Sequence, residues 1–340
     1  MSKYLSEILI IQLIATYLVI LGHSYPFITP IPGWLQSTQI FIYCFHMPLF
    51  VFISGYLLIY TSQASKNNFK GFLRKRFLKL LVPYISLSLI AIIPKFYLQQ
   101  YLNDSMSADW NGVIRAFLVP RENIWGHFWF LPMIFLQGLA GLIVDKIFIK
   151  LNICKAGWMI TTVILFLLYF ESFNQPITPW VSISDLTKFS WFFSLGCTCA
   201  YFDLLNKIRC LRPLVGSIAL FLISLIWFST CDKWHLTAVT QGALAVLMIA
   251  SMLLLGTYLS EKINFNKDSV YTETFIIFLL SWPCQIVINV TAERLLHLPY
   301  YLIMPLQFLA GIAGPIILIK IINYIENKYK IHWISFLLGK

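Results

Sequence analysis

The run from Phe45 to Tyr56 places an ionisable ring, a helix-breaking residue and a small polar residue inside an otherwise apolar stretch: His46, Pro48 and Ser54. Pro48 has no N–H to donate, so a helix through this run leaves the carbonyl of Cys44 without its usual partner, beside His46. An imidazole that titrates near neutral pH can exchange a proton with a substrate. Because lipid penalises unpaired polar groups, the run predicts a functional site that faces protein or water. A packed kink with a hydrogen-bonded histidine is the alternative.

Two more histidines fall at the same predicted depth. His23 ends the first apolar segment and His127 begins the fourth, so together with His46 three of the six histidines lie toward one membrane face. Gln12 precedes His23 by about three helical turns, which places both side chains on one helix face about 16 Å apart. The histidines therefore mark one depth of the chain as the place for proton-transfer chemistry.

The densest positive charge lies at the opposite membrane face, where Arg74, Lys75, Arg76 and Lys79 precede Pro83. Cations at the start of a helix oppose the helix dipole, which favours anions there. A bound polyanion such as a phosphorylated cofactor would relieve this arrangement, because Arg and Lys form charge-assisted bonds to phosphate. The alternative is a juxtamembrane cluster that fixes topology and contacts anionic lipid.

A third cluster runs from His127 to Pro132 and includes Trp129 and two phenylalanines. Aromatic residues at a membrane boundary usually anchor the protein in the interface. Trp129 could also stack on a sugar ring, although nothing in the spacing requires it.

The composition requires that a membrane surround these residues. The 340 residues are 59% hydrophobic and 11% charged, with mean hydropathy +0.77. A soluble domain carries about 25% charged residues, so an aqueous fold is excluded. The net charge of +11 belongs to the loops, and it therefore does not indicate a nucleic-acid partner.

About ten apolar segments are long enough to cross a hydrocarbon core of about 30 Å. They cover residues 5–23, 39–60, 77–99, 127–148, 157–171, 188–205, 213–230, 237–258, 273–290 and 301–323. Cytoplasmic N- and C-termini put most of the 25 lysines and arginines inside, as the positive-inside rule requires. The sequence thus predicts an all-α, polytopic membrane helix bundle forming a single domain over 1–340. The stretch 99–126 predicts a short helix on the outer surface.

Four motifs resemble one known family over about the first 135 residues. They are Val19–His23, Phe45–Tyr56, the basic cluster followed by Pro83 and Tyr84, and Trp129–Pro132. In order and separation they are similar to the acyltransferase 3 family of integral-membrane O-acyltransferases, and most closely to its branch of fucose 4-O-acetylases and other polysaccharide acetyltransferases. The second motif is the most specific, because FHMPLFVFISGYL is improbable as generic membrane sequence.

The resemblance implies transfer of an acyl group, usually acetyl, from cytoplasmic acyl-CoA to a hydroxyl of a surface or lipid-linked glycan. It makes His23 the catalytic base, with His46 and Gln12 as further catalytic candidates. No metal is implied, and acetyl-CoA acts as co-substrate. The resemblance assigns the CoA phosphates to Arg74, Lys75, Arg76 and Lys79, and it assigns the wall of the tunnel or substrate site to Ser54, His127 and Trp129.

The chain departs from the family pattern at two positions. The family commonly has an arginine where this chain has Gln12, and it often has a histidine in the late segment where this chain has Ser281 before Trp282 and Pro283. Glutamine can orient a partner through hydrogen bonds but supplies no charge.

Two other classes of function remain open for such a chain. A transporter or flippase of lipid-linked glycan also uses intramembrane polar residues, but its halves often carry matching interrupted helices. Here the motifs concentrate in the first four segments. A non-catalytic scaffold is favoured slightly by Gln12 and Ser281 and opposed by His23 and the basic cluster. The expected setting is the bacterial cytoplasmic (inner) membrane, with membrane lipid and a glycan as partners; the acceptor sugar, the acyl group and the oligomeric state stay open.

Overall fold

A computed structural model describes residues 6–62, 68–98, 110–174, 177–208, 212–263, 267–331 and 333–339. Within these ranges the chain is helical and contains no strand. Eight of the described helices are long and apolar enough to cross a membrane. The prediction of an all-α polytopic membrane bundle is therefore confirmed.

The helices follow one another with short connections. In the first half of the chain they are α1 (Ser6–His23), α2 (Gly33–Tyr60), α3 (Phe69–Arg76), the π-helical turn η1 (Phe77–Leu81), α4 (Val82–Leu98), α5 (Trp110–Leu118), the 3₁₀ turn η3 (Pro120–Glu122) and α6 (Phe130–Leu151). In the second half they are α7 (Cys154–Asn174), η4 (Trp180–Ser182), α8 (Ile183–Tyr201), α9 (Leu204–Ile208), α10 (Pro213–Thr230), α11 (Ala238–Lys262), α12 (Lys267–Asn289), the π-helical turn η5 (Val290–Leu295), α13 (Tyr300–Tyr329) and α14 (Trp333–Leu337).

The eight candidate spans are α1, α2, α6, α7, α10, α11, α12 together with η5, and α13. The other two expected segments, 77–99 and 188–205, correspond to α4 and α8, which are helical but fall outside that set. Residues 5 and 99, at the ends of two expected spans, lie outside the described ranges. Within 99–126, residues 99–109 also lie outside, and the remainder contains the short helix α5.

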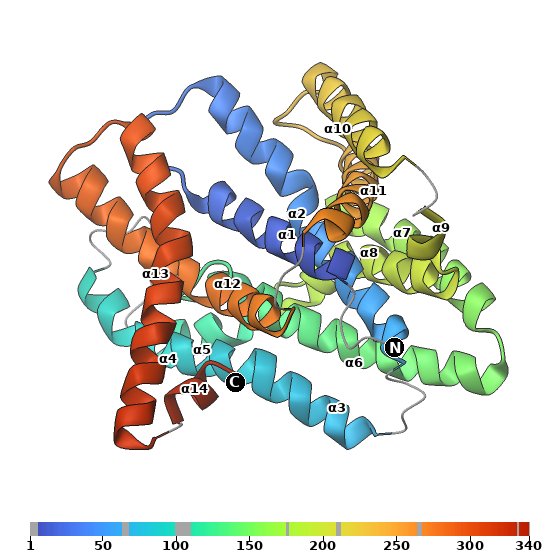
Figure 1. Cartoon of the computed structure of the whole chain (residues 1–340), viewed down its shortest axis with the longest axis horizontal. Coiled ribbons are helices and arrows are strands. Elements are labelled where there is room, and N and C mark those ends of the chain that lie inside the picture. The colour runs from blue at the N-terminus through green and yellow to red at the C-terminus, as the bar shows by residue number, and fades with distance from the viewer. Residues whose placement is uncertain are drawn as a thin grey trace.

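Helix α1 lies at the centre of the bundle (Figure 1) and packs against α2, α11 and α12, while α13 lies beside α12 and α10 beside α11. Outward-facing apolar side chains cover α7 and α10, among them Ile160, Leu167 and Ile226. Apolar side chains suit a surface that faces lipid, and the backbone polar groups of a helix are already paired within it.

The Ser54-Gly55 pair of the central motif marks a close helix crossing. A methyl group at Gly55 would overlap the backbone carbonyl of Phe193 in α8, and one at Gly196 would overlap the carbonyl of Phe52. Small residues let helix backbones approach closely in membranes, where packing rather than the hydrophobic effect drives association. Gly55 is thus required by the α2–α8 contact, and this leaves Ser54 at a fixed depth beside it.

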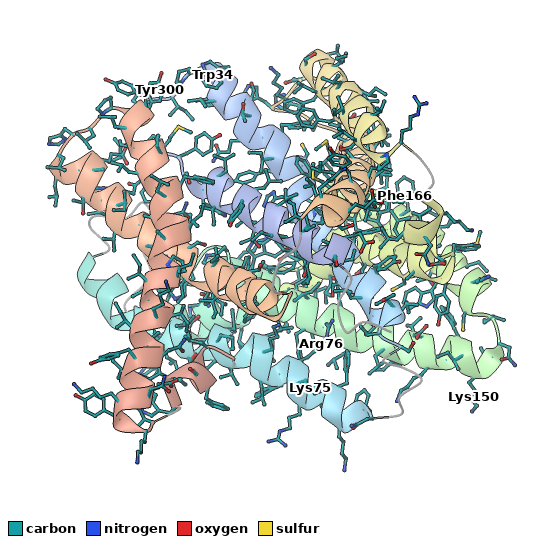
Figure 2. The ribbon with its side chains drawn as sticks, viewed as in Figure 1. Trp34, Lys75, Arg76, Lys150, Phe166 and Tyr300 are labelled. Carbon is teal, nitrogen blue, oxygen red and sulfur yellow. The ribbon has the colours of Figure 1, made fainter. Side chains whose placement is uncertain are left out.

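The two ends of the bundle differ in chemistry. Trp34 and Tyr300 lie at one end of the molecule and Lys75 and Lys150 at the other (Figure 2). The segments after α1 and before α13 share the Trp34 end, while the basic α3 shares the lysine end. We call these the outer and inner ends, following the orientation expected from the charge distribution.

Candidate active site

Two cavities lie at different depths of the bundle. The outer pocket has a volume of about 440 Å³ and is lined by His23, Tyr43 and Trp282 and by the segment that follows α1. The inner cavity has a volume of about 870 Å³ and is lined by residues of α1, α2, α3, η1, α6 and α12. The two sets of lining residues have no member in common. Both volumes fall in the range of small-molecule sites.

His23 is the last residue of α1 and is surrounded by rings. Its imidazole meets Trp282 edge-on at 4.6 Å between centroids, and lies 6.0 Å from Tyr43 and 6.5 Å from His127. Neither aspartate nor glutamate lines the outer pocket in the described part of the chain. The neutral form of an imidazole is the form that accepts a proton.

Helix α2 holds the end of α1 in place. The carbonyl of Gly22 accepts hydrogen bonds from the Tyr43 hydroxyl at 2.7 Å and from the Gln39 amide at 3.0 Å. The last carbonyls of a helix have no partner within the helix, so outside donors are needed where the helix ends in a buried place. Tyr43 and Gln39 supply them and fix the backbone directly before His23.

A ladder of polar side chains on α12 and η5 binds the other side of the same segment. Gln285 donates to the carbonyl of Ile20 and to the hydroxyl of Ser24, each at 2.9 Å, and Asn289 donates to the carbonyl of Tyr25 at 3.4 Å. Glu293 continues the ladder after another four residues. We call Gln285, Asn289 and Glu293 the polar ladder.

The Glu293 carboxylate accepts three backbone hydrogen bonds, from Phe27 and Ile28 at 2.8 Å and from Thr29 at 2.5 Å. Phe27 and Thr29 line the outer pocket. Sequence reasoning missed the polar ladder. The available signal was its spacing, since residues four apart share one helix face and three polar residues in an apolar helix seldom do so without a target.

The other two histidines take different places. The Nδ1 atom of His46 bonds the carbonyl of Ile42 at 2.8 Å, one turn earlier in its own helix, and not the carbonyl that Pro48 leaves free. Its ring lies 5.2 Å from Tyr43. His46 therefore contacts the ring that supports the His23 segment and lines neither cavity. Its hydrogen bond is local, because the i−4 carbonyl is the nearest acceptor to a helical side chain.

His127 lies in the wall between the two cavities and is 5% exposed. Its ring packs edge-on against Phe278 at 5.4 Å and lies 6.1 Å from Trp282. Neither ring nitrogen makes a hydrogen bond within the described residues, although the backbone of Phe278 and Leu279 lies near enough to influence the ring electrostatically.

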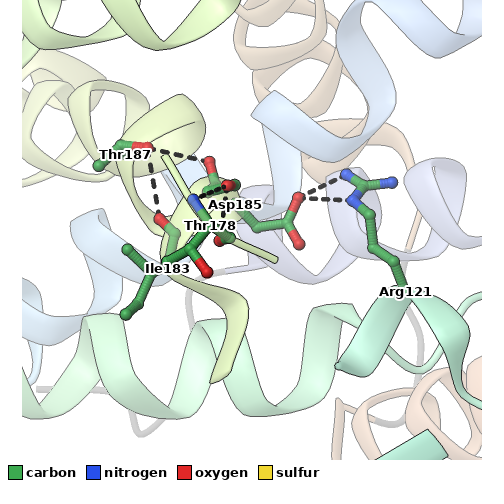
Figure 3. A network of polar contacts seen from close by, with 6 residues as sticks. Arg121, Thr178, Ile183, Asp185 and Thr187 are labelled. Atoms are coloured by element: carbon green, nitrogen blue, oxygen red, sulfur yellow. Dashed lines mark hydrogen bonds and ion pairs between the residues drawn. The ribbon is translucent and has the colours of Figure 1, made fainter. Parts of the chain in front are cut away.

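Trp129 makes its contacts with α8 and with Arg121. Its ring stacks on Phe189 at 5.5 Å, and the Arg121 guanidinium lies over it at 4.2 Å. Arg121 also binds Asp185 at the start of α8, where Thr178 and Thr187 complete a network of hydrogen bonds (Figure 3). Trp129 thus joins α6 to α8 and lines neither cavity.

The inner cavity collects most of the predicted donor-binding residues. Lys75, Arg76 and Lys79 line it together with Ser54 and Gln12, whereas Arg74 is exposed outside its wall. Gln12 lies about 16 Å from His23 along α1. It lines the inner cavity with the cations and does not reach the outer pocket that His23 lines.

Arg76 is oriented by hydrogen bonds to two other helices. Its guanidinium donates to the carbonyl of Ile134 in α6 at 2.8 Å and to the Ser54 hydroxyl at 3.3 Å. A methyl group at Gly138 would overlap this guanidinium, so the glycine in α6 makes the room that it occupies. Lys79, on the π-helical turn η1, lies 4.9 Å over the ring of Phe275. Such turns often occur at functional sites.

The arrangement separates two kinds of chemistry. The inner cavity presents cations and a hydroxyl, which suit a phosphorylated molecule. The outer pocket presents an imidazole among aromatic rings, with the amides of Gln36 and Gln39. No group of three or more possible metal ligands occurs among the described residues.

Comparisons with known proteins identify the family to which the chain is similar. A family model described as "Acyltransferase domain" matches residues 6–324. Nodulation protein NolL of Sinorhizobium fredii (strain NBRC 101917 / NGR234) is 30% identical over 183 residues, which cover 53% of this chain. The match spans 44% of the length of that relative. No solved structure matches the chain.

Proposed function

The chain belongs to the acyltransferase 3 family of multi-pass membrane O-acyltransferases, and we propose from this that it moves an acetyl group from cytoplasmic acetyl-CoA to a hydroxyl of a surface or lipid-linked polysaccharide. His23 acts as the general base. Within the family we place the chain in the branch similar to fucose 4-O-acetylases, and in the cell in the bacterial cytoplasmic membrane.

The separation of the two cavities supports this proposal most strongly. Three cations line the inner cavity and a histidine lines the outer pocket, so donor and acceptor have distinct sites at opposite depths. A donor with a phosphorylated head and a long arm suits such a pair of sites, because the head can stay at the cations while the arm reaches the histidine. The donor then enters from the inner end and the acceptor from the outer end.

In the proposed reaction the acceptor hydroxyl lies beside His23. The imidazole takes the hydroxyl proton while the oxygen forms a bond to the thioester carbonyl carbon, and the carbon–sulfur bond then breaks. The proton passes from the imidazolium to the departing sulfur, which leaves as the free thiol. A positioned base of this kind contributes about 10² to 10⁴ in rate.

The lining of the outer pocket favours a saccharide acceptor. Tyr43, Trp234 and Trp282 offer aromatic faces, and Gln36 and Thr29 offer hydrogen-bonding groups. Aromatic rings combined with a few placed polar groups are a common construction of a specific small-molecule site. The carbon–hydrogen faces of a sugar ring pack on aromatic rings while its hydroxyls need such polar partners.

On the donor side we assign the CoA phosphates to Lys75, Arg76 and Lys79. Their charges face a common cavity, and Arg76 is already oriented by two hydrogen bonds. Arg74 is exposed just outside the cavity, where we expect it to contribute by attracting the polyanion from solution.

The proposal is tested by measuring transfer of label from radiolabelled acetyl-CoA to lipid-linked glycans in membranes that contain the protein. His23→Ala should lower the rate by about 10² to 10⁴. The matched control is His297→Asn, at an exposed histidine that lines neither cavity. Equal rates for the parent and His23→Ala would exclude His23 as the general base. A parent that labels no glycan, while deletion of the chain alters glycan export, would favour a transporter instead.

A further inference from the structure

Three phenylalanine rings from three helices close the outer end of the inner cavity. Phe50 of α2, Phe130 of α6 and Phe278 of α12 all line this cavity. Their centroids lie 5.9 Å (Phe50 to Phe130), 6.3 Å (Phe50 to Phe278) and 5.9 Å (Phe130 to Phe278) apart. Each ring therefore contacts both of the others, and we call the group the phenylalanine triangle.

The barrier between the two cavities is thin. On α12 the cavity-lining residues change from Phe278 to Trp282, which is about 6 Å of helix at 1.5 Å per residue. On α1 they change from Thr16 to Gly22, about 9 Å of helix. The phenylalanine triangle and the rings directly above it fill this distance.

A continuous line of rings crosses the barrier. Phe278 contacts His127 at 5.4 Å, and His127 lies 6.5 Å from His23 in the outer pocket. Phe130 and Phe278 are 8% and 6% exposed and Phe50 is partly buried, and the three rings pack against one another. A molecule that extends from the inner cavity to His23 must displace at least one of these rings.

Helix α12 has a weak point beside the triangle. Pro283 has no N–H, so the carbonyl of Leu279 lacks its helical partner, and the chain can bend between Phe278 and Trp282. Such a bend moves Phe278 relative to the rest of the triangle while Trp282 stays against His23. The ring most exposed to this motion is therefore Phe278.

We propose that the phenylalanine triangle is the selectivity element of the acyl path, with Phe278 as its moving ring, and that it admits linear acyl groups while excluding branched and aromatic ones. This rests on the proposed function, because it takes the acyl end of the thioester as the leading end. A linear chain needs one ring to turn aside. A branched or aromatic group needs the rings to separate further, and close-packed neighbours resist that.

The first test compares acyl groups of different cross-section. The parent should transfer acetyl much faster than isobutyryl or benzoyl from the respective CoA thioesters, and Phe278→Ala should reduce this preference by about tenfold or more. Phe278→Leu, which keeps more of the volume, serves if the alanine variant does not fold. The matched control is Phe275→Ala, one turn away on α12, which lines the inner cavity outside the triangle. The control should alter the KM for the donor and keep the acyl preference.

The second test does not depend on catalysis. Leu57→Cys places a thiol in the inner cavity. A small charged methanethiosulfonate reagent is added to the outer side of sealed right-side-out vesicles. Labelling of the parent chain, which has leucine at this position, gives the background. Combining Leu57→Cys with Phe278→Ala should raise the labelling rate about tenfold over Leu57→Cys alone, as expected for a widened path.

The outcomes separate the two proposals. An unchanged acyl preference in both Phe278 variants, or equal labelling with and without the ring, overturns the selectivity role of the triangle. A parent that transfers no acyl group overturns the proposed function, and the labelling result then decides whether the triangle is a barrier.

Discussion

Replacing Glu293 with glutamine should weaken acceptor use and spare donor use. The carboxylate binds three backbone N–H groups of the segment that follows α1, and hydrogen bonds to a charged group contribute about 1.5–3 kcal/mol each. Glutamine keeps one oxygen, which can still serve Ile28 and Thr29, but it turns an NH₂ group toward the N–H of Phe27. The free energy that fixes the segment after α1 in place should fall by about 2–4 kcal/mol.

Part of this loss is offset by the contacts that remain. Asn289 still binds the carbonyl of Tyr25, and Phe27 still packs against Trp282 at 6.3 Å. We therefore expect kcat/KM for the acceptor to fall about tenfold, which corresponds to about 1.4 kcal/mol. The KM for acetyl-CoA should not change, because no ladder residue lines the inner cavity.

The assay is acetyl transfer in membranes with each substrate varied in turn, normalised to the amount of folded protein. Glu326→Gln is the matched control, since that buried carboxylate accepts hydrogen bonds from the backbone N–H and the hydroxyl of Ser335 in α14 and does not line the outer pocket. The control should leave the acceptor KM unchanged. A Glu293→Gln protein with normal acceptor kinetics, or with its defect in the donor KM, would refute the reasoning.

Two further substitutions probe the positions of the charged and polar groups. Gly138→Ala should displace the Arg76 guanidinium and raise the KM for acetyl-CoA by about tenfold, the effect of losing one charge-assisted contact. Gly126→Ala is the control, because a methyl group there meets open space, and it should leave this KM unchanged. Gln285→Leu removes both hydrogen bonds to the end of α1 and should lower the free energy of unfolding by about 1–3 kcal/mol, measurable as a lower midpoint of thermal unfolding in detergent; an unchanged midpoint would show that the ladder does not stabilise the fold.

The apolar spans were predictable because length and hydropathy are local properties of the chain. The same holds for α5, whose apolar residues repeat on one face. The π-helical turn η1, which joins α3 directly to α4, was not predictable, since such a turn leaves no pattern that helix propensity would reveal. The basic cluster could be placed at one membrane face from charge alone, but the depth of Arg76 in the bundle depends on Gly138, a residue of a different helix.

The polar ladder shows what sequence spacing leaves undetermined. Gln285, Asn289 and Glu293 lie on one helix face by their spacing, yet their targets are backbone groups more than 250 positions earlier. Only the packing of α12 on α1 brings them together. The position of Trp129 follows the same logic, because its partners Arg121 and Phe189 come from segments whose approach no local pattern determines.

Of the two departures from the family pattern, Gln12 lines the inner cavity, whereas Ser281 is buried in α12 directly before Trp282 and lines neither cavity. Ser281 stands where the family often has a histidine, and its hydroxyl donates to the carbonyl of Phe278 in its own helix at 3.4 Å. The second imidazole near His23 is that of His127, at 6.5 Å between ring centroids. Gln12 lines the inner cavity with the cations. An arginine there would add a fourth positive charge to the donor side, where three already lie, and at about 16 Å along the helix it would not touch His23. Gln12 should therefore affect the affinity for the donor. Ser281 should affect which second imidazole lies beside His23.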